Sequence, residues 1–279
     1  MIKFIGQSKA KEFVKRRKSL PNCTVIIGPK RSGKSTFARY ICEELGYHCV
    51  FIDNKVDSIR EMIELSSSLA QPTLFVTRMS GMSVGAKNSL LKVTEEPPKN
   101  VHLCLLAYTE GDVLDTLISR SWVINLLPYS PDEVAYYLER YVKGVRDIIP
   151  LSTLFSSPGQ VNQVIVEYGK EGLQLYLDKV QFFYDNIFEA SSSNALKMAD
   201  WFRFKDTDTA ENTLIPELFL ELCMNYIGAQ NRNILNPPVL VRNYALLRKL
   251  AICLGSVSTK GRNKLFAINK LIKEVHEIG

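Results

Sequence analysis

The chain carries one segment whose residue types and spacing suit phosphate binding. Residues 28–35 read Gly-Pro-Lys-Arg-Ser-Gly-Lys-Ser, which fits the pattern G-x-x-x-x-G-K-[ST]. In this pattern the glycines let successive N–H groups point at phosphate oxygens, the lysine reaches the terminal phosphates, and the hydroxyl completes the shell of a magnesium ion. We therefore predict binding of ATP or ADP with Mg²⁺, with Ser35 as the protein's magnesium ligand. The predicted nucleotide contacts from this loop are Gly28, Pro29, Lys30, Arg31, Ser32, Gly33, Lys34, Ser35 and Thr36.

The residues on either side of this loop favour the same interpretation. The apolar run 24–27 precedes the loop as a buried strand, and residues 36–42 follow with helical spacing. A helix that starts directly after the loop adds the partial positive charge of its N-terminus to the phosphate site. Strand, loop and helix in this order make a chance match to the pattern improbable.

The first 127 residues alternate between strand and helix patterns. We expect strands at 24–27, 49–52, 73–76, 101–107 and 122–126, with helices at about 8–19, 36–42, 59–65 and 83–94 and a short helix before the fifth strand. Strict alternation predicts an α/β fold with a parallel sheet covered on both faces. The ligand site of such a sheet lies at the carboxyl ends of its strands.

From Pro128 onward the pattern becomes helical. Helices are expected near 131–143, 159–168, 171–188, 194–203, 214–228, 238–255 and 261–278. Proline, glycine and serine stretches separate them. We expect a nucleotide-binding sheet domain at 1–127, a helical lid at 128–185 and a larger helical domain at 186–279.

Composition limits the class of protein. The 279 residues are 46% hydrophobic, carry a formal net charge of +6, and include six scattered cysteines without a C-x-x-C pair. Scattered cysteines indicate reduced core residues, and we expect no zinc. No apolar stretch approaches the length of a membrane span and the first residues lack a signal-peptide core, so we expect a cytoplasmic protein with no membrane contact.

Four further segments recur in a specific order. They are Ile-Gly-Gln at 5–7, Asn-Ser-Leu-Leu-Lys-Val-Thr-Glu-Glu-Pro-Pro at 88–98, a Ser-Arg pair within 116–121, and Ser-Pro-Gly-Gln at 157–160. With the phosphate loop, this set resembles the AAA+ subunits of bacterial DNA polymerase III clamp loaders, the gamma/tau and delta-prime family. The resemblance covers about residues 1–165 motif by motif, and the remainder only through its helical character.

The resemblance implies a hetero-oligomer. In this family ATP lies between subunits, and an arginine of the Ser-Arg motif reaches the neighbour's terminal phosphate; Arg120 matches that position, and a bidentate cation suits phosphoryl-transfer charge. Gly6 and Gln7 would border the adenine pocket, and residues 186–279 would form the collar through which subunits assemble. The implied partners are other clamp-loader subunits, the sliding clamp, DNA polymerase and the backbone of primer-template DNA.

The implied DNA contacts lie at the start of the helix after strand three. Ser80, Ser83 and Lys87 are there, and they would hold the phosphate backbone without reading sequence. Three polar residues at a helix start are equally the composition of a capping region. The sequence leaves both interpretations open.

Several positions depart from the family pattern. Counted back from Asn88, the places of the Asp-Glu pair that holds magnesium and activates water contain Thr77 and Arg78. Neither is a general base, and a guanidinium opposes binding of a divalent cation. The lid position of an ATP-sensing arginine holds Gln160, and the polar residue after strand four is Tyr108 or Thr109. Whether the chain hydrolyses ATP itself stays open.

Two observations place the chain nearer delta-prime than gamma/tau. Only residues 46–48 separate the loop helix from strand two, where gamma/tau carries a zinc module, and the Ser-Arg motif persists without the catalytic carboxylates. An enzyme alternative is a stand-alone P-loop ATPase or kinase in which Asp53 serves substrate or metal, with Lys30 and Arg31 extending the phosphate site. A third possibility is a bacteriophage or mobile-element AAA+ adaptor that uses nucleotide only to fix its shape.

Overall fold

A computed structural model describes the chain except for residues 1–3, 67, 189–191, 203–213, 260–262 and 277–279. The chain divides into two compact units, Met1–Tyr129 and Ser130–Gly279. The first boundary that we expect, after residue 127, lies within two residues of this division. The further division of the helical part at 185/186 stays a prediction.

The first unit is a five-stranded parallel sheet with the order β2-β3-β4-β1-β5. The strands are β1 Cys23–Ile27, β2 His48–Phe51, β3 Thr73–Arg78, β4 Val101–Ala107 and β5 Trp122–Asn125. The helices are α1 Ser8–Lys15, α2 Lys34–Leu45, α3 Val56–Ser66, α4 Val84–Glu95, the 3-10 turn η1 Glu110–Asp112 and α5 Asp115–Ile118. The expected α/β sheet is thus confirmed.

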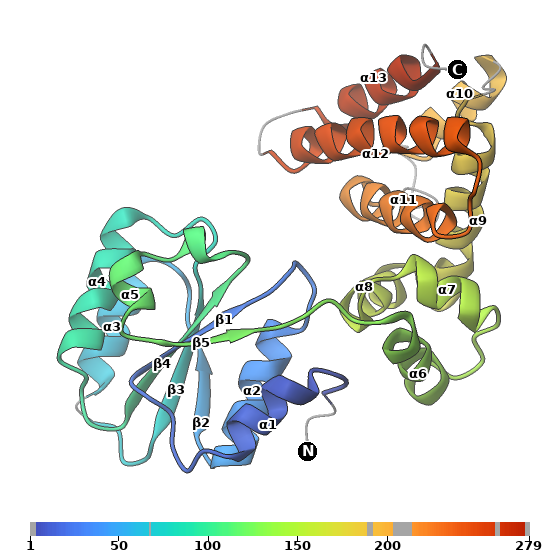
Figure 1. Ribbon diagram of the computed structural model, residues 1–279. Helices are drawn as coiled ribbons and strands as arrows, with labels where there is room; N and C mark the ends of the chain where they lie inside the picture. The colour runs from blue at the N-terminus through green and yellow to red at the C-terminus, as the bar shows by residue number, and fades with distance from the viewer. Residues whose placement is uncertain (1–3, 67, 189–191, 203–213, 260–262, 277–279) are drawn as a thin grey trace. The chain divides into compact units, whose positions relative to one another are not determined.

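Helices cover both faces of this sheet, with α1 and α2 on one and α3, α4 and α5 on the other (Figure 1). Because side chains alternate along a strand, the strands contribute side chains to two hydrophobic cores, one on each face of the sheet. Leu103 and Leu105 of β4 pack with α3 and α4, whereas Cys104 and Leu106 pack with α1 and α2. Burial along nearly all of β1 and β4 explains why both strands are mainly apolar, with Thr24 and His102 as the polar exceptions.

Glycines fix the ends of α2. Gly33 lies directly before the helix with φ 84°, and Gly46 follows it with φ 73°. Both values are in the left-handed region, which side chains with a Cβ disfavour. The phosphate-loop glycine therefore also starts the helix whose N-terminus faces the loop.

One expected helix of this unit is too long. We expected residues 8–19, but α1 ends at Lys15. The next residues are further cations, and the chain turns there so that the Arg17 guanidinium stacks 4.5 Å from the ring centre of Trp122 and 5.0 Å from that of Phe13. Packing on aromatic rings thus replaces a further helical turn.

The second unit is helical in its described residues. Its helices are α6 Pro131–Tyr141, α7 Ile148–Leu154, α8 Pro158–Tyr168, α9 Glu171–Asn186, α10 Ser192–Asp200, α11 Pro216–Asn231, α12 Pro237–Val257 and α13 Lys264–His276. Every helix expected here has a counterpart. The expected ends at 203, 261 and 277–278 lie outside the described residues.

Helix α7 was not expected. It is short, and Pro150 lies at its third position, where a proline costs no helical hydrogen bond. Helix α13 is amphipathic. The side chains of Ile268, Leu271, Ile272 and Val275 are buried, and the lysines of the opposite face are exposed.

Polar contacts join the two halves of this second unit. Gln160 of α8 is 4% exposed and donates from Nε2 to Glu221 of α11 at 3.0 Å. Asn225 of α11 donates to the Leu154 carbonyl at 2.9 Å. The residue at the expected sensor position is therefore engaged in packing α8 on α11, through a partly buried hydrogen bond that needs its amide.

Candidate nucleotide-binding site

The phosphate loop is the turn between β1 and α2, and its geometry depends on its glycines. The Gly28 amide donates to the Ala107 carbonyl at 3.2 Å. A Cβ at Gly28 would lie 2.9 Å from Ser32 Oγ and 3.1 Å from Leu126 Cβ. Arg31 and Gly33 both have positive φ, 63° and 84°. The loop therefore folds tightly enough that Gly28 admits no side chain.

Lys34 occupies the centre of this turn. Its Nζ donates to the carbonyls of Gly28 and Pro29, both at 2.7 Å. The same ammonium group lies 4.6 Å from the ring centre of Tyr108, the first residue after β4. The cation expected to reach the phosphates is thus held over the loop, with Tyr108 beneath it.

The pKa of Lys34 is lowered from 10.5 to about 8. Burial is the largest cause, the positive charge of Arg78 lowers the pKa further, and Asp112 acts in the opposite direction. Desolvation and a like charge both disfavour an ammonium ion. A polyphosphate would add negative charge to a site in which burial and Arg78 outweigh Asp112.

Of the two candidates for the polar residue after β4, Tyr108 lies by the loop. Thr109 instead caps η1, and the Asp112 carboxylate accepts the backbone N–H groups of Tyr108 and Thr109 at 2.8 and 3.0 Å. Thr109 is therefore engaged in the turn itself.

The N-terminal segment lies against the other side of the loop. Phe4 stacks on Tyr40 and packs at a tilt against Phe37 of α2, and its ring would contact a Cβ at Gly33. Tyr129 donates its hydroxyl to the Ser32 carbonyl at 3.4 Å. Two aromatic residues outside the motif thus flank the loop, and no short sequence pattern indicates them.

Gln7 joins this segment to the end of β5. Its Nε2 donates to the Leu127 carbonyl at 2.6 Å, and its Oε1 accepts the Leu127 N–H at 2.9 Å. Gln7 is buried, with φ 56°, and Gly6 before it also has positive φ. The structure thus gives Gln7 a structural contact, and its predicted role at the adenine base stays a prediction.

A cavity of about 480 Å³ opens beside the loop, at the carboxyl ends of β2, β3 and β4. This is the edge where a parallel sheet binds its ligand. Its polar lining residues are Asp53, Asn54, Thr77, Arg78, Ser80 and Tyr108. Tyr108 belongs both to this lining and to the contact with Lys34, so the cavity adjoins the loop.

The end of β3 offers no carboxylate to a metal. Thr77 is 1% exposed and its hydroxyl has no hydrogen-bond partner among the described residues, while Arg78 is exposed. Among the described residues no group of three or more His, Cys, Asp or Glu side chains could hold a metal ion. Within the part of the chain that the structure describes, Ser35 is present at its expected place at the start of α2, and its role as a magnesium ligand stays a prediction.

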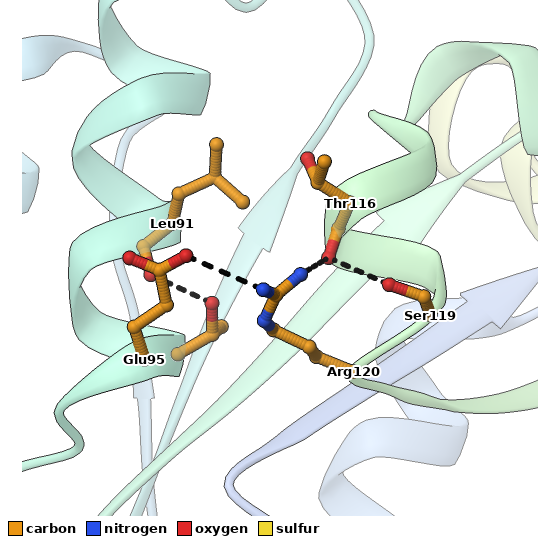
Figure 2. A network of polar contacts seen from close by, with 6 residues as sticks. Leu91, Glu95, Thr116, Ser119 and Arg120 are labelled. Carbon is orange, nitrogen blue, oxygen red and sulfur yellow. Dashed lines mark hydrogen bonds and ion pairs between the residues drawn. The ribbon is translucent and has the colours of Figure 1, made fainter.

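Arg120 is not among the residues that line this cavity. It lies between α5 and β5 (Figure 2). Its guanidinium donates to the Thr116 carbonyl at 2.9 Å and pairs with the Glu95 carboxylate at 3.5 Å. The side chains of Arg120 and Glu95 are 44% and 53% exposed. Glu95 comes from the Glu-Glu-Pro-Pro segment, so two separate motifs meet at this pair.

The three predicted DNA contacts lie at the start of α4 but have local roles as well. Ser83 caps the helix by accepting the Ala86 N–H at 3.2 Å. Lys87 donates to the Asp112 carbonyl at 2.6 Å, and the Ser80 carbonyl accepts a hydrogen bond from Asn54. Ser80 and Ser83 are exposed, and Lys87 is partly buried. DNA contact at these residues stays a prediction.

Comparison with known proteins gives a consistent result. A sequence model of the family described as "DNA polymerase III, delta subunit" matches residues 49–130. A DNA polymerase III subunit delta' from Buchnera aphidicola subsp. Baizongia pistaciae (strain Bp) is 27% identical over 148 residues. That match covers 52% of this chain and 43% of the relative, so the chain spans less than half the length of the curated relative it matches.

A solved structure shares the fold. The DNA polymerase III gamma subunit-related protein from Thermotoga maritima MSB8 superposes with a TM-score of 0.55 at 15% identity. The superposition covers 95% of this chain and 98% of the other. Residues 49–130 are thus similar to the DNA polymerase III delta-subunit family, and the chain shares the fold of the gamma subunit-related protein.

In the part of the chain that the structure describes, none of the helices has the length and apolarity to cross a bilayer.

Proposed function

We propose that the chain is a delta-prime-like clamp-loader subunit that binds ATP or ADP at its P-loop without hydrolysing it. The observation that carries this proposal is the pairing of a complete loop with a β3 end that contains Thr77 and Arg78. Hydrolysis needs a base to orient and activate water. A threonine hydroxyl and a guanidinium do not perform that role.

The second part of the proposal assigns Arg120 to a neighbouring subunit. The guanidinium is about half exposed, always charged, and held by one carbonyl and one exposed carboxylate. An exposed ion pair of this kind is weak, about 0–1 kcal/mol, so a neighbour's phosphate can displace Glu95. Arg120 would then act in trans on ATP bound to the adjacent subunit.

The proposed setting is a cytoplasmic hetero-oligomer on primer-template DNA. The relatives are subunits of DNA polymerase III, which supports partners of that kind. The second unit would contribute the collar, and α4 would face the DNA backbone through Ser80, Ser83 and Lys87. Phosphate contacts at a helix start would position a duplex without reading its sequence.

A binding and turnover assay on the isolated chain tests the first part of the proposal. Calorimetric titration with ATP and with ADP should detect binding, Lys34→Ala should abolish it, and steady-state phosphate release should stay at background. The matched control is Lys99→Ala, which removes an exposed lysine from the turn before β4, away from the phosphate loop. Binding to Lys34→Ala at the unaltered affinity would contradict the assignment of the loop.

A second candidate function has one structural observation in its favour. Asp53 follows β2 and lines the same cavity as Arg78 and Tyr108, so a carboxylate is present at the ligand edge of the sheet. Against it, β2 is the edge strand, with β3 and β4 between it and β1. Steady ATP turnover or phosphate transfer that disappears in Asp53→Ala would establish this stand-alone ATPase or kinase instead.

A further inference from the structure

The ligands that a nucleotide-bound magnesium ion needs are largely replaced here. Mg²⁺ prefers carboxylate and water oxygens in octahedral geometry. The two positions at the end of β3 where carboxylates are expected contain a buried hydroxyl, that of Thr77, and a cation, Arg78. Asp53 and Asp112 are the nearby acids, but Asp112 accepts two backbone N–H groups and Asp53 follows the edge strand. This donor set does not fit the metal.

Arg78 projects on the same face of the sheet as the phosphate-loop helix. Along β3, Leu74 and Val76 pack in the core under α1 and α2, and Arg78 continues that alternation. Its partner in register is Leu106 of β4, which in turn pairs with Ile26 at the end of β1. Arg78 is therefore separated from the loop strand by β4 alone.

The electrostatics agree with this placement. Arg78 is close enough to lower the pKa of Lys34. Arg78 and Tyr108 both line the cavity, and Lys34 lies over the Tyr108 ring, so the two cations belong to one region. Within the part of the chain that the structure describes, the Arg78 guanidinium has no hydrogen bond or ion pair. Two like charges kept in one place favour an anionic ligand.

We propose that this site binds its nucleotide as a metal-free polyphosphate, with Arg78 in the place of Mg²⁺. The inference rests on the proposed nucleotide binding and specifies the ligand's form. A guanidinium presents a planar set of donors that matches phosphate oxygens in a bidentate arrangement. It also repels a divalent cation at the same oxygens, so the metal and Arg78 compete rather than cooperate. Ser35 then donates its hydroxyl to phosphate instead of ligating magnesium.

Calorimetric titration of ATP into the full chain, once in Mg²⁺ and once in excess EDTA, tests this inference. We expect an affinity that is unchanged or stronger in EDTA. Arg78→Glu restores a carboxylate and should invert the dependence: binding in EDTA weakens about tenfold or more, and Mg²⁺ recovers it. Arg78→Gln should weaken binding in EDTA without creating a requirement for metal.

Arg60→Glu is the matched control, because it makes the same charge change on an exposed residue of α3, on the other face of the sheet. It should leave the metal dependence of the wild-type chain unchanged. Wild-type binding that requires Mg²⁺ would overturn the inference and leave the proposed nucleotide binding intact. Failure to bind ATP in either buffer would overturn the proposed nucleotide binding itself, and the inference with it.

Discussion

The guanidinium of Arg120 lies 3.5 Å from the carboxylate of Glu95, and the pair joins the Ser-Arg segment to the Glu-Glu-Pro-Pro segment (Figure 2). Both side chains are about half exposed, so solvent screens the pair. The Thr116 carbonyl fixes the other side of the guanidinium. Arg120 is thus oriented by a carbonyl of the preceding helix α5 and only lightly held by Glu95, which agrees with the proposed action on a neighbour.

This relationship predicts a small effect of Glu95 on folding. Glu95→Gln should change the free energy of unfolding by less than about 1 kcal/mol, because exposed ion pairs contribute little. Urea denaturation followed by circular dichroism measures the change. The control is Glu12→Gln, which breaks the exposed Arg16–Glu12 pair at 3.3 Å. A loss of several kcal/mol for Glu95→Gln alone would mean that Arg120 is a structural clamp.

Gln7 should matter far more for stability. Its amide exchanges two partly buried hydrogen bonds with Leu127, and Gln7→Ala removes both of them. Each lost bond costs about 0.5–1.5 kcal/mol. We expect a comparable loss in the free energy of unfolding of the first unit, measured by urea denaturation. Gln174→Ala, which removes one exposed bond to Asp178 within α9, should cost less than about 0.5 kcal/mol. Equal effects would contradict the contact.

Nucleotide affinity should fall with rising pH because of Lys34. In the protein alone its pKa is about 8, so above that pH the ammonium group loses its proton. Bound polyphosphate favours the charged form, and the complex therefore binds more protons than the free protein above pH 8. The contribution of Lys34 to nucleotide affinity should be constant up to about pH 8. Above that pH the affinity should decrease by up to about tenfold per pH unit.

Titration of ATP at about pH 7.5 and about pH 9.5 measures this dependence. Lys34→Arg provides the comparison, because a guanidinium keeps its charge across the range. Where Lys34→Arg retains measurable binding, its affinity should vary less with pH than that of the wild-type chain. A wild-type affinity that is equal at the two pH values would show that protonation of Lys34 is not coupled to ATP binding.

The sheet was predictable because each strand is a short apolar run between turn residues. β4 begins and ends at the expected residues, and counting from Asn88 located Thr77 and Arg78 at the end of β3. Local spacing carries this information, because side chains alternate along a strand and helices need a fixed period. The resemblance to clamp-loader subunits, from which the proposed function starts, rests on short local motifs of the same kind.

Long-range contacts were not predictable in this way. Gln7 and Leu127 are 120 residues apart, and no local pattern indicates that an amide will pair with that backbone. The Glu95–Arg120 pair and the packing of Tyr129 on the loop likewise depend on how the chain returns to the sheet. Helix α7 was missed because seven residues that include a proline give too little periodicity.

The central claim is that this chain contributes Arg120 to catalysis on its neighbour. The most direct measurement is DNA-stimulated ATP hydrolysis by a complex assembled with the partner subunits of the same host, in which only the adjacent ATP site is competent. Removal of an arginine finger costs about a thousandfold or more in phosphoryl-transfer rate. Arg120→Ala should therefore nearly abolish turnover, while complex formation by size exclusion and ATP binding to this chain persist. Arg60→Ala, an exposed arginine of α3, should leave the rate unchanged. Turnover of the Arg120→Ala complex at the unaltered rate would contradict the account.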